Sequence, residues 1–222
     1  MKKKKTKWLV VTGLDGSGKT TLVENLTKWL QDDKQFSVKR DRFTHDNYLV
    51  SKLLNKSKDR YTDRILFVLD NRLFGTELKE LIEAGEYDFI VTQRGFLDSF
   101  VHGAVQGYSY SWIEEMNQLA DMPKCDVMIH MVCEAGIAYS RICDDPDADK
   151  FEYPVYMEKQ EAETRKAFKE IMEGSNPALE HFKNSKNIYI DSTQMTTDEV
   201  FALAKSKLQQ VLFSDSNPKE SA

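Results

Sequence analysis

Short apolar runs alternate with longer stretches of helical periodicity along most of this chain. The apolar runs predict strands at residues 8–12, 36–40, 88–93, 126–132 and 187–191. Between and after them, apolar residues recur at helical spacing. This spacing predicts helices over residues 20–31, 47–55, 60–84, 111–120, 135–143, 153–173 and 197–212. The alternation indicates an α/β fold with a five-stranded parallel sheet, helices on both faces and right-handed crossovers.

The residues that follow each predicted strand are the first place to look for chemistry. Ligands of open parallel sheets bind beyond the carboxyl ends of the strands. In this chain those positions are residues 12–20, 42–46, 93–99, 133 onward and 192–194.

The end of the first predicted strand carries a phosphate-binding pattern. Residues 10–21 read V-V-T-G-L-D-G-S-G-K-T-T, in which Gly13, Gly18, Lys19 and Thr20 fit G-x-x-x-x-G-K-[ST]. Because a strand precedes the loop and a helix follows it, backbone N–H groups and the positive end of the helix dipole point at an anion. Lys19 adds a charge for the β- and γ-phosphates, and the Thr20 hydroxyl is an oxygen ligand for Mg²⁺. The pattern predicts a nucleoside triphosphate site.

Composition narrows the class of protein. The 222 residues, 41% apolar and 30% charged, suit one soluble domain over residues 1–222, with disordered tails at 1–6 and 214–222. No run approaches the ~18 consecutive apolar residues of a membrane span, and no long apolar core follows the lysine-rich N-terminus, as a secretory signal requires. Three cysteines without metal-site spacing suit reduced thiols and a cytoplasmic location. The net charge of −5 disfavours nucleic acid as a partner without excluding it.

Side chains for a phosphate acceptor follow the second strand and lie in the long helix. Arg42 and Phe43 pair a cation with a ring at a strand end, an arrangement that fits an anionic ring compound and an ordinary surface loop equally well. In the helix over 60–84, Phe67 lies beside the helix face that carries Arg72. Arg64 lies on the same helix face as Arg72, and a solvated surface explains it equally well.

The third strand is followed by further candidates. Arg94 stands where a cation can offset charge on both sides of a phosphoryl transfer. Asp98 and His102 are four residues apart, so on a helix they form either a general-base pair or a capping aspartate beside an incidental histidine. The Asp- and Pro-containing stretch at about 141–152 predicts a mobile lid.

Taken together, these residues resemble the thymidylate kinase family of P-loop nucleoside-monophosphate kinases, from about residue 8 to residue 212. The resemblance rests on the phosphate loop, Asn71-Arg72, Arg94, the lid ending at 149–152 and the final strand with Asp191-Ser192. It implies a three-layer P-loop kinase fold with a short lid, ATP and Mg²⁺ as cofactors, a small-molecule nucleotide substrate, and a homodimer formed through a helical face.

The resemblance also implies a role for individual residues. Asp15 approaches the sugar 3′-hydroxyl of the acceptor, Arg72 contacts its pyrimidine or phosphate, and Arg94 bridges both phosphates. Arg141 and Lys150 supply lid charge. The donor nucleotide is expected at Gly13, Asp15, Gly16, Ser17, Gly18, Lys19, Thr20, Thr21, Ser192 and Gln194, with adenine beside the last two. The acceptor is expected at Asp15, Arg42, Phe43, Phe67, Arg72, Arg94, Asp98 and His102.

Departures from the family pattern concentrate on the acceptor side. Gln93 stands where the family has an aspartate that helps to hold Mg²⁺ through water. Asp46 holds the place of a second arginine, and Asp98 that of a small hydroxyl residue. His102 replaces the aromatic residue that excludes a ribose 2′-hydroxyl, and Phe67 is offset by one residue from the stacking phenylalanine. The sequence therefore predicts an altered acceptor site.

Two functions remain open on this basis. One is ATP-dependent transfer of a phosphoryl group to a deoxynucleoside monophosphate, most similar to dTMP, giving the diphosphate. The other is phosphorylation of a hydroxyl on a nucleoside or hydroxymethylpyrimidine, free or in DNA, with Asp98 as general base. Fewer arginines and a gained carboxylate disfavour a doubly charged acceptor and support this alternative.

Overall fold

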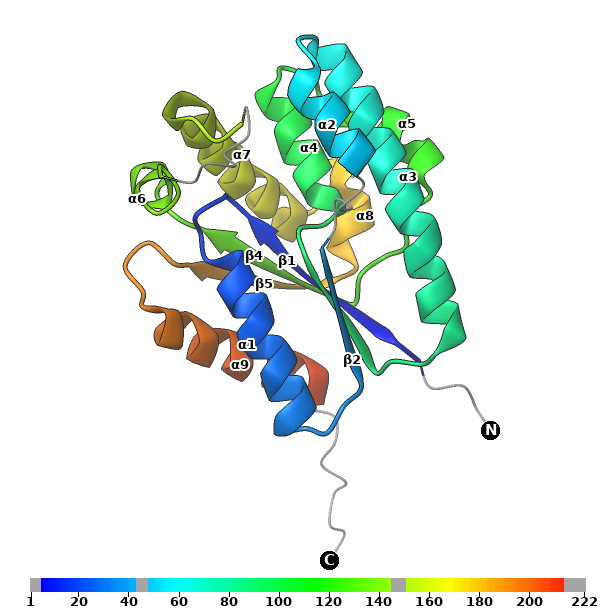
Figure 1. Ribbon diagram of the computed structural model, residues 1–222, viewed down its shortest axis with the longest axis vertical. Helices are drawn as coiled ribbons and strands as arrows, with labels where there is room; N and C mark the ends of the chain where they lie inside the picture. Colours follow the sequence, from blue (N-terminus) through cyan, green and yellow to red (C-terminus); the bar gives the residue numbers. More distant parts are fainter. Residues whose placement is uncertain (1–4, 43–47, 145–150, 214–222) are drawn as a thin grey trace, which may run out of the picture.

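A parallel sheet of five strands forms the centre of the computed structural model, which describes residues 5–42, 48–144 and 151–213. The strand order is β2-β3-β1-β4-β5 (Figure 1). All four neighbouring pairs are parallel. The predicted five-stranded α/β fold is confirmed. The strands are β1 (Lys7–Gly13), β2 (Val38–Arg42), β3 (Phe89–Gln93), β4 (Val127–Val132) and β5 (Lys186–Asp191).

Central strands of a parallel sheet are covered on both faces, and this explains their unbroken apolar runs. Every residue of β4 and the last six of β1 are buried. Strand β2, predicted at 36–40, is found two residues later, because its ladder with β3 starts at Val38, paired with Phe89. Phe36 instead packs its ring edge-on against Phe89.

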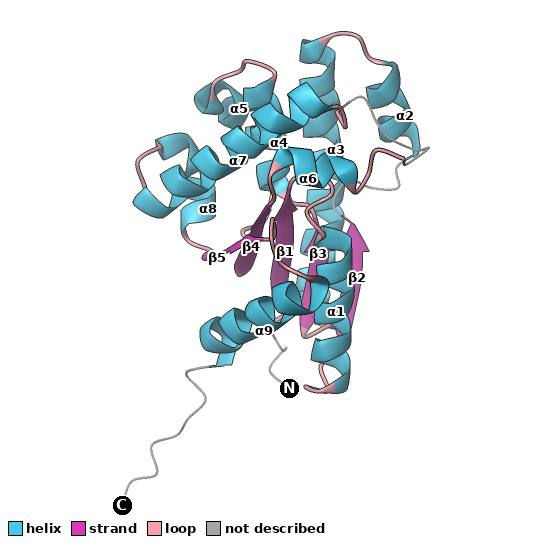
Figure 2. Ribbon diagram, turned by 90° about the vertical axis from the view of Figure 1, so that its left-hand side faces the viewer, coloured by secondary structure: helices cyan, strands magenta, loops and turns pink. Residues whose placement is uncertain are grey.

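The helices pack on both faces of the sheet and make three layers (Figure 2). Helices α1 and α9 cover one face, and α3, α4, α5, α7 and α8 the other (Figures 1 and 2). The α-helices are α1 (Lys19–Asp32), α2 (Tyr48–Lys56), α3 (Arg60–Ala84), α4 (Phe96–Val105), α5 (Tyr110–Asn117), α6 (Ala135–Ser140), α7 (Pro154–Glu173), α8 (Glu180–Lys183) and α9 (Thr197–Phe213). Two short 3₁₀ turns lie at Gln118–Ala120 and Pro177–Leu179.

Helix α4 is absent from the predicted helices, and its burial explains why. Its first eight residues, Phe96 to Gly103, are all buried. A short, mostly apolar and buried segment cannot be assigned to helix or strand from periodicity alone. Helix α8 was also not predicted and is only one turn long. Helix α6 ends at Ser140, three residues before the predicted end.

The predicted tails and lid fall mostly outside the described residues, which omit 1–4, 145–150 and 214–222. Thr6, placed in the predicted N-terminal tail, is buried and donates a hydrogen bond to the Tyr87 carbonyl at 2.7 Å. Within the described ranges, every helix is too short or too polar to cross a membrane. Cys125 and Cys133 are buried free thiols, and Cys143 is an exposed one.

Candidate active site

The loop between β1 and α1 is shaped by glycines that no other residue can replace. Gly13 has φ of +139°, and a Cβ there would lie 1.8 Å from the Met131 carbonyl oxygen of β4. Gly16 has φ of +76°, and its Cβ would lie 2.1 Å from the Ala138 carbonyl oxygen of α6. The backbone of the loop is therefore pressed against two other elements in a conformation open to glycine.

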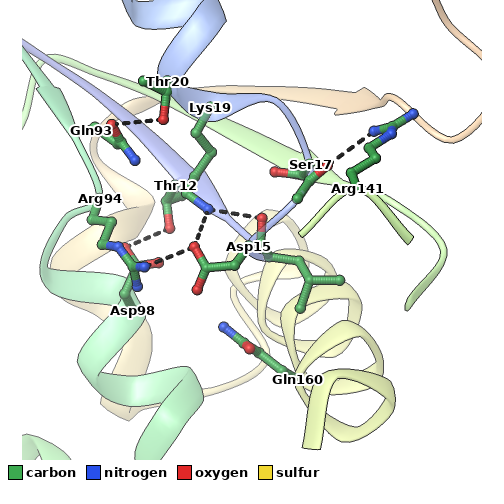
Figure 3. Close-up of polar contacts among 12 residues, drawn as sticks. Thr12, Asp15, Ser17, Lys19, Thr20, Gln93, Arg94, Asp98, Arg141 and Gln160 are labelled. Atoms are coloured by element: carbon green, nitrogen blue, oxygen red, sulfur yellow. Dashed lines mark hydrogen bonds and ion pairs between the residues drawn. The ribbon is translucent and has the colours of Figure 1, made fainter. Parts of the chain in front are cut away.

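Two cationic side chains meet at one carboxylate oxygen beside the loop (Figure 3). Asp15 Oδ1 accepts hydrogen bonds from Lys19 Nζ at 3.1 Å and from Arg94 Nη2 at 2.7 Å. Lys19 also donates to the Leu14 carbonyl at 2.8 Å, and only 3% of it is exposed. Lys19 and Arg94 therefore meet at the same carboxylate, with Asp15 lying between them.

Electrostatics at this cluster follow from burial and charge pairing. Burial would raise the pKa of Asp15, but Arg94 and Lys19 outweigh it, so this pKa falls well below its usual range. Burial lowers the pKa of Lys19, an effect that Asp15 opposes. The Asp15 carboxylate is therefore charged at neutral pH and partly neutralises the two cations that phosphates would meet.

Arg94 has a backbone conformation that non-glycine residues rarely adopt. It directly follows β3 with φ of +67°, and its N–H donates to the Val11 carbonyl at 2.8 Å. Such strain persists only where the surroundings over-determine the position, and it clusters at functional sites. Here it turns the side chain out of the strand direction toward Asp15.

Asp98 has a structural role in this arrangement. It is the third residue of α4, and its Oδ2 accepts the Gly95 N–H at 2.7 Å and the Thr12 hydroxyl at 2.8 Å. This is the helix-capping geometry that the sequence left open. Burial raises the pKa of Asp98, against the opposing charges of Arg94 and Lys19.

Thr20 and Gln93 present neutral oxygens side by side. The Thr20 hydroxyl donates to Gln93 Oε1 at 3.1 Å. Among the described residues, no group of three or more His, Cys, Asp or Glu side chains gathers to hold a metal. Mg²⁺ commonly binds through few protein ligands plus substrate phosphates and water, so this oxygen pair fits it.

A pocket of about 450 Å³ opens beside the loop and suits the donor nucleotide. Ser192 donates to the Ser17 carbonyl at 2.9 Å, so β5 is tied to the loop at the pocket. Arg141 donates to the Gly16 carbonyl at 3.0 Å from the opposite side. The lining includes Asp15, Gly16, Ser17, Gly18, Lys19, Thr20, Thr21, Gln93, Arg141 and Ser192.

The sequence analysis missed the apolar walls of this pocket. Ile142, Met195 and Val200 line it together with Met131. Gln194, by contrast, lies in a separate hollow with Glu161 and Arg165. These apolar residues belong to no sequence motif, and Met131 lies within β4. Only the folded chain could therefore identify them as pocket residues.

Around Phe67 and His102, two of the predicted acceptor residues, rings from three elements pack together. Phe67 of α3 lies 5.6 Å from the His102 ring of α4, with 22° between the ring planes, and only 9% of Phe67 is exposed. His102 Nδ1 is hydrogen-bonded to the Tyr156 hydroxyl of α7 at 2.9 Å. Burial, then Arg94 and Arg64, lower the pKa of His102 to about 3. The imidazole is therefore neutral at physiological pH.

Other predicted acceptor residues do not join this group. Arg72 is half exposed and lies 3.5 Å from Asp121. Arg42 ends β2. Phe43 and Lys150 lie outside the described residues.

Comparison with known proteins identifies the family of this chain. The family model described as thymidylate kinase matches residues 11–202. The chain belongs to the thymidylate kinase family. A probable thymidylate kinase of Metallosphaera sedula is 26% identical over 65% of this chain and 69% of its own length. Probable thymidylate kinase 1 of Saccharolobus solfataricus is 29% identical over 63% of this chain and 71% of its own length. A probable thymidylate kinase of Methanobrevibacter smithii is 27% identical over 70% of this chain and 77% of its own length.

Membership of the thymidylate kinase family decides the class of reaction. The protein is an ATP-dependent nucleotide kinase, with the phosphate loop, the strained arginine and the donor pocket in one place. Its substrates are small-molecule nucleotides.

Proposed function

We propose that this kinase transfers the γ-phosphoryl group of ATP, bound with Mg²⁺, to a deoxynucleoside monophosphate of thymidylate type, giving the diphosphate. One observation carries the proposal. Lys19 of the donor loop and Arg94 of the neighbouring strand end lie on the same carboxylate oxygen, at 3.1 and 2.7 Å. Two cations this close can stabilise charge on both phosphates as it spreads over the transferred group.

The position of each side chain in the site indicates its role in the proposed reaction. Lys19 serves the β- and γ-phosphates, and Arg94 bridges donor and acceptor once Asp15 releases both cations. Thr20 and Gln93 would hold Mg²⁺, which supplies charge neutralisation between phosphate oxygens when bound. An acceptor phosphate is already an anionic nucleophile, so no general base is required. Asp98 can therefore remain the cap of α4.

A hydroxyl acceptor is the second candidate, and one observation favours it. Burial raises the pKa of Asp98, which brings a carboxylate nearer to the range of an effective general base. Its Oδ2 is occupied by Gly95 and Thr12, and this weakens the candidate. A cytoplasmic location stays a prediction.

A panel of acceptors with ATP–Mg²⁺ tests the proposal. The panel contains all deoxynucleoside monophosphates, free nucleosides and hydroxymethylpyrimidines, and wild type is compared with Asp98→Asn. We expect dTDP from dTMP, and we expect it to persist in Asp98→Asn after correction for the folded fraction. Absence of monophosphate turnover, together with transfer to a hydroxyl that depends on Asp98, would establish the second candidate instead.

A further inference from the structure

Arg64 is a buried cation whose hydrogen-bonding capacity is mostly unused. It lies on α3, and 2% of it is exposed. Its Nη1 donates to the Ser99 carbonyl of α4 at 2.8 Å. Its Nε and Nη2 atoms are buried and have no hydrogen-bond partner among the described residues. The Ser99 hydroxyl, on the residue that anchors Arg64, is a third buried polar atom without such a partner.

Packing alone does not account for an arginine here. Burial lowers the pKa of Arg64 to about 10, so the side chain remains charged at neutral pH. No ion pair between Arg64 and a carboxylate occurs in the described parts of the chain. A buried charge without a partner is destabilising, and an apolar side chain of similar size is often tolerated better. Such a group is a candidate for ligand binding.

The unused atoms define the chemistry of the ligand. In a guanidinium group, the Nε–H and Nη2–H bonds form one edge and point the same way, while Nη1 lies on the other side. The Ser99 carbonyl holds Nη1, so the free edge is fixed in orientation. Two parallel N–H donors suit two adjacent acceptor atoms, such as the oxygens of a phosphate or carboxylate, or the acceptor edge of a base.

The neighbours of Arg64 connect it to the phosphate-binding group. The guanidinium carbon lies 4.2 Å from the centre of the Phe67 ring. His102 stacks on Phe67, and the charges of both Arg94 and Arg64 act on the His102 imidazole. The imidazole thus lies within electrostatic range of both arginines. Under the proposed function, a nucleotide whose phosphate binds Arg94 would extend toward Phe67 and Arg64.

We propose that Arg64, rather than Arg72, is the specificity-determining arginine of the acceptor site. Its free edge donates two hydrogen bonds to adjacent oxygen or nitrogen atoms of the nucleotide that receives the phosphoryl group. This inference rests on the proposed function, because it assigns the acceptor to the side of α3 and α4. Arg64 is buried, so the acceptor reaches this edge only after the side chains that cover it move.

Matched arginine variants on α3 test the proposal. Arg64→Met removes the donor edge and keeps an apolar stem, and Arg64→Lys keeps the charge without the fork. Arg72→Met tests the rival assignment. Lys79→Met is the control, because Lys79 lies on the same helix and pairs with Asp121 outside the candidate site. The measurements are KM for the acceptor, KM for ATP, kcat and melting temperature.

We expect Arg64→Met to raise the acceptor KM at least about tenfold, with an unchanged ATP KM and an unchanged or higher melting temperature. Arg64→Lys should recover only part of the loss, and Lys79→Met should stay within about twofold of wild type. Arg72→Met should raise the acceptor KM less than Arg64→Met does. An unchanged acceptor KM in Arg64→Met overturns the proposal. A lower melting temperature with both KM values shifted equally also overturns it, because that result marks a structural role. If Arg64→Met does not fold, Arg64→Lys decides by the same two KM values.

Calorimetry distinguishes whether Arg64 binds the base or a phosphate. It also separates a failure of the Arg64 proposal from a failure of the proposed function. Wild type and Arg64→Met are titrated with thymidine, dTMP and inorganic phosphate. Loss of thymidine binding in the variant assigns the edge to the base, and loss of phosphate binding alone assigns it to a phosphate. If no monophosphate is a substrate, the proposed function fails. In that case the affinity for thymidine tests the role of Arg64. If wild type and Arg64→Met bind thymidine equally well, the proposal for Arg64 is wrong.

Discussion

At the scale of single residues, the Arg94 side chain gives the sharpest test of the site. Its planar fork reaches Asp15 from a left-handed backbone with φ of +67°. Lysine keeps the charge but cannot hold two phosphate oxygens at once. We expect Arg94→Lys to lower kcat/KM at least about tenfold with little change in melting temperature.

The control for Arg94→Lys is the same substitution at Arg165. Arg165 pairs with Glu161 and Asp191 in the hollow outside the donor pocket. Steady-state kinetics and thermal unfolding of both variants provide the measurement. If Arg94→Lys stays within twofold of wild type while folded, Arg94 has no part in phosphoryl transfer.

At the scale of elements, α3 has an apolar stripe on its outer side. Tyr61, Ile65, Leu69 and Leu73 follow each other at four-residue spacing and are 40–49% exposed. Four such residues in line form a contiguous apolar face. We propose that this face joins two copies of the chain, as the expected homodimer requires. Leu69→Glu should then convert a dimer to a monomer in analytical ultracentrifugation at micromolar concentration, because the same carboxylate enters a two-fold interface twice.

The matched control for the dimer is Met172→Glu on α7. Met172 is 57% exposed and lies on a different helix, so this variant should sediment like wild type. Wild type that sediments as a monomer would refute the dimer, and a dimer that survives Leu69→Glu would place it on another surface.

At the scale of the whole molecule, two buried histidines link stability to pH. Burial lowers the pKa of His102 to about 3, with Arg94 and Arg64 adding to the effect, and burial lowers that of His130 to about 4. The unfolded chain protonates these rings near pH 6.5. Between about pH 6.5 and 4, the unfolded state therefore binds more protons than the folded state, so the free energy of unfolding falls as the pH falls.

We expect urea unfolding to show this loss between pH 7 and pH 5, where the Asp15 carboxylate still keeps its charge. His102→Phe should show a shallower decline over the same interval, because one of the two rings no longer titrates. A free energy of unfolding that is constant from pH 7 to 5 in wild type would contradict the linkage.

The sequence by itself determined the fold class and the phosphate loop. Both depend on local information. The loop is a run of neighbouring residues between a strand and a helix, and its glycines are required by the backbone conformation at Gly13 and Gly16. The central strands β1, β3 and β4 are buried on both faces and so read as apolar runs. Helix α3 was predicted with its observed limits, 60–84, because its periodic pattern continues over seven turns.

Only the tertiary structure decided which polar side chains meet. Asp15 and Arg94 are 79 residues apart, and their contact follows from the pairing of β1 with β3. Arg64 and Arg72 read alike in the sequence, yet one is buried against Ser99 and the other is half exposed beside Asp121. Helix α4 packs on α3 and is itself buried, and the sequence of α3 does not contain this neighbour that buries Arg64. Which part of a helix face becomes a site is set by the element that packs on it, and a linear pattern does not contain that neighbour.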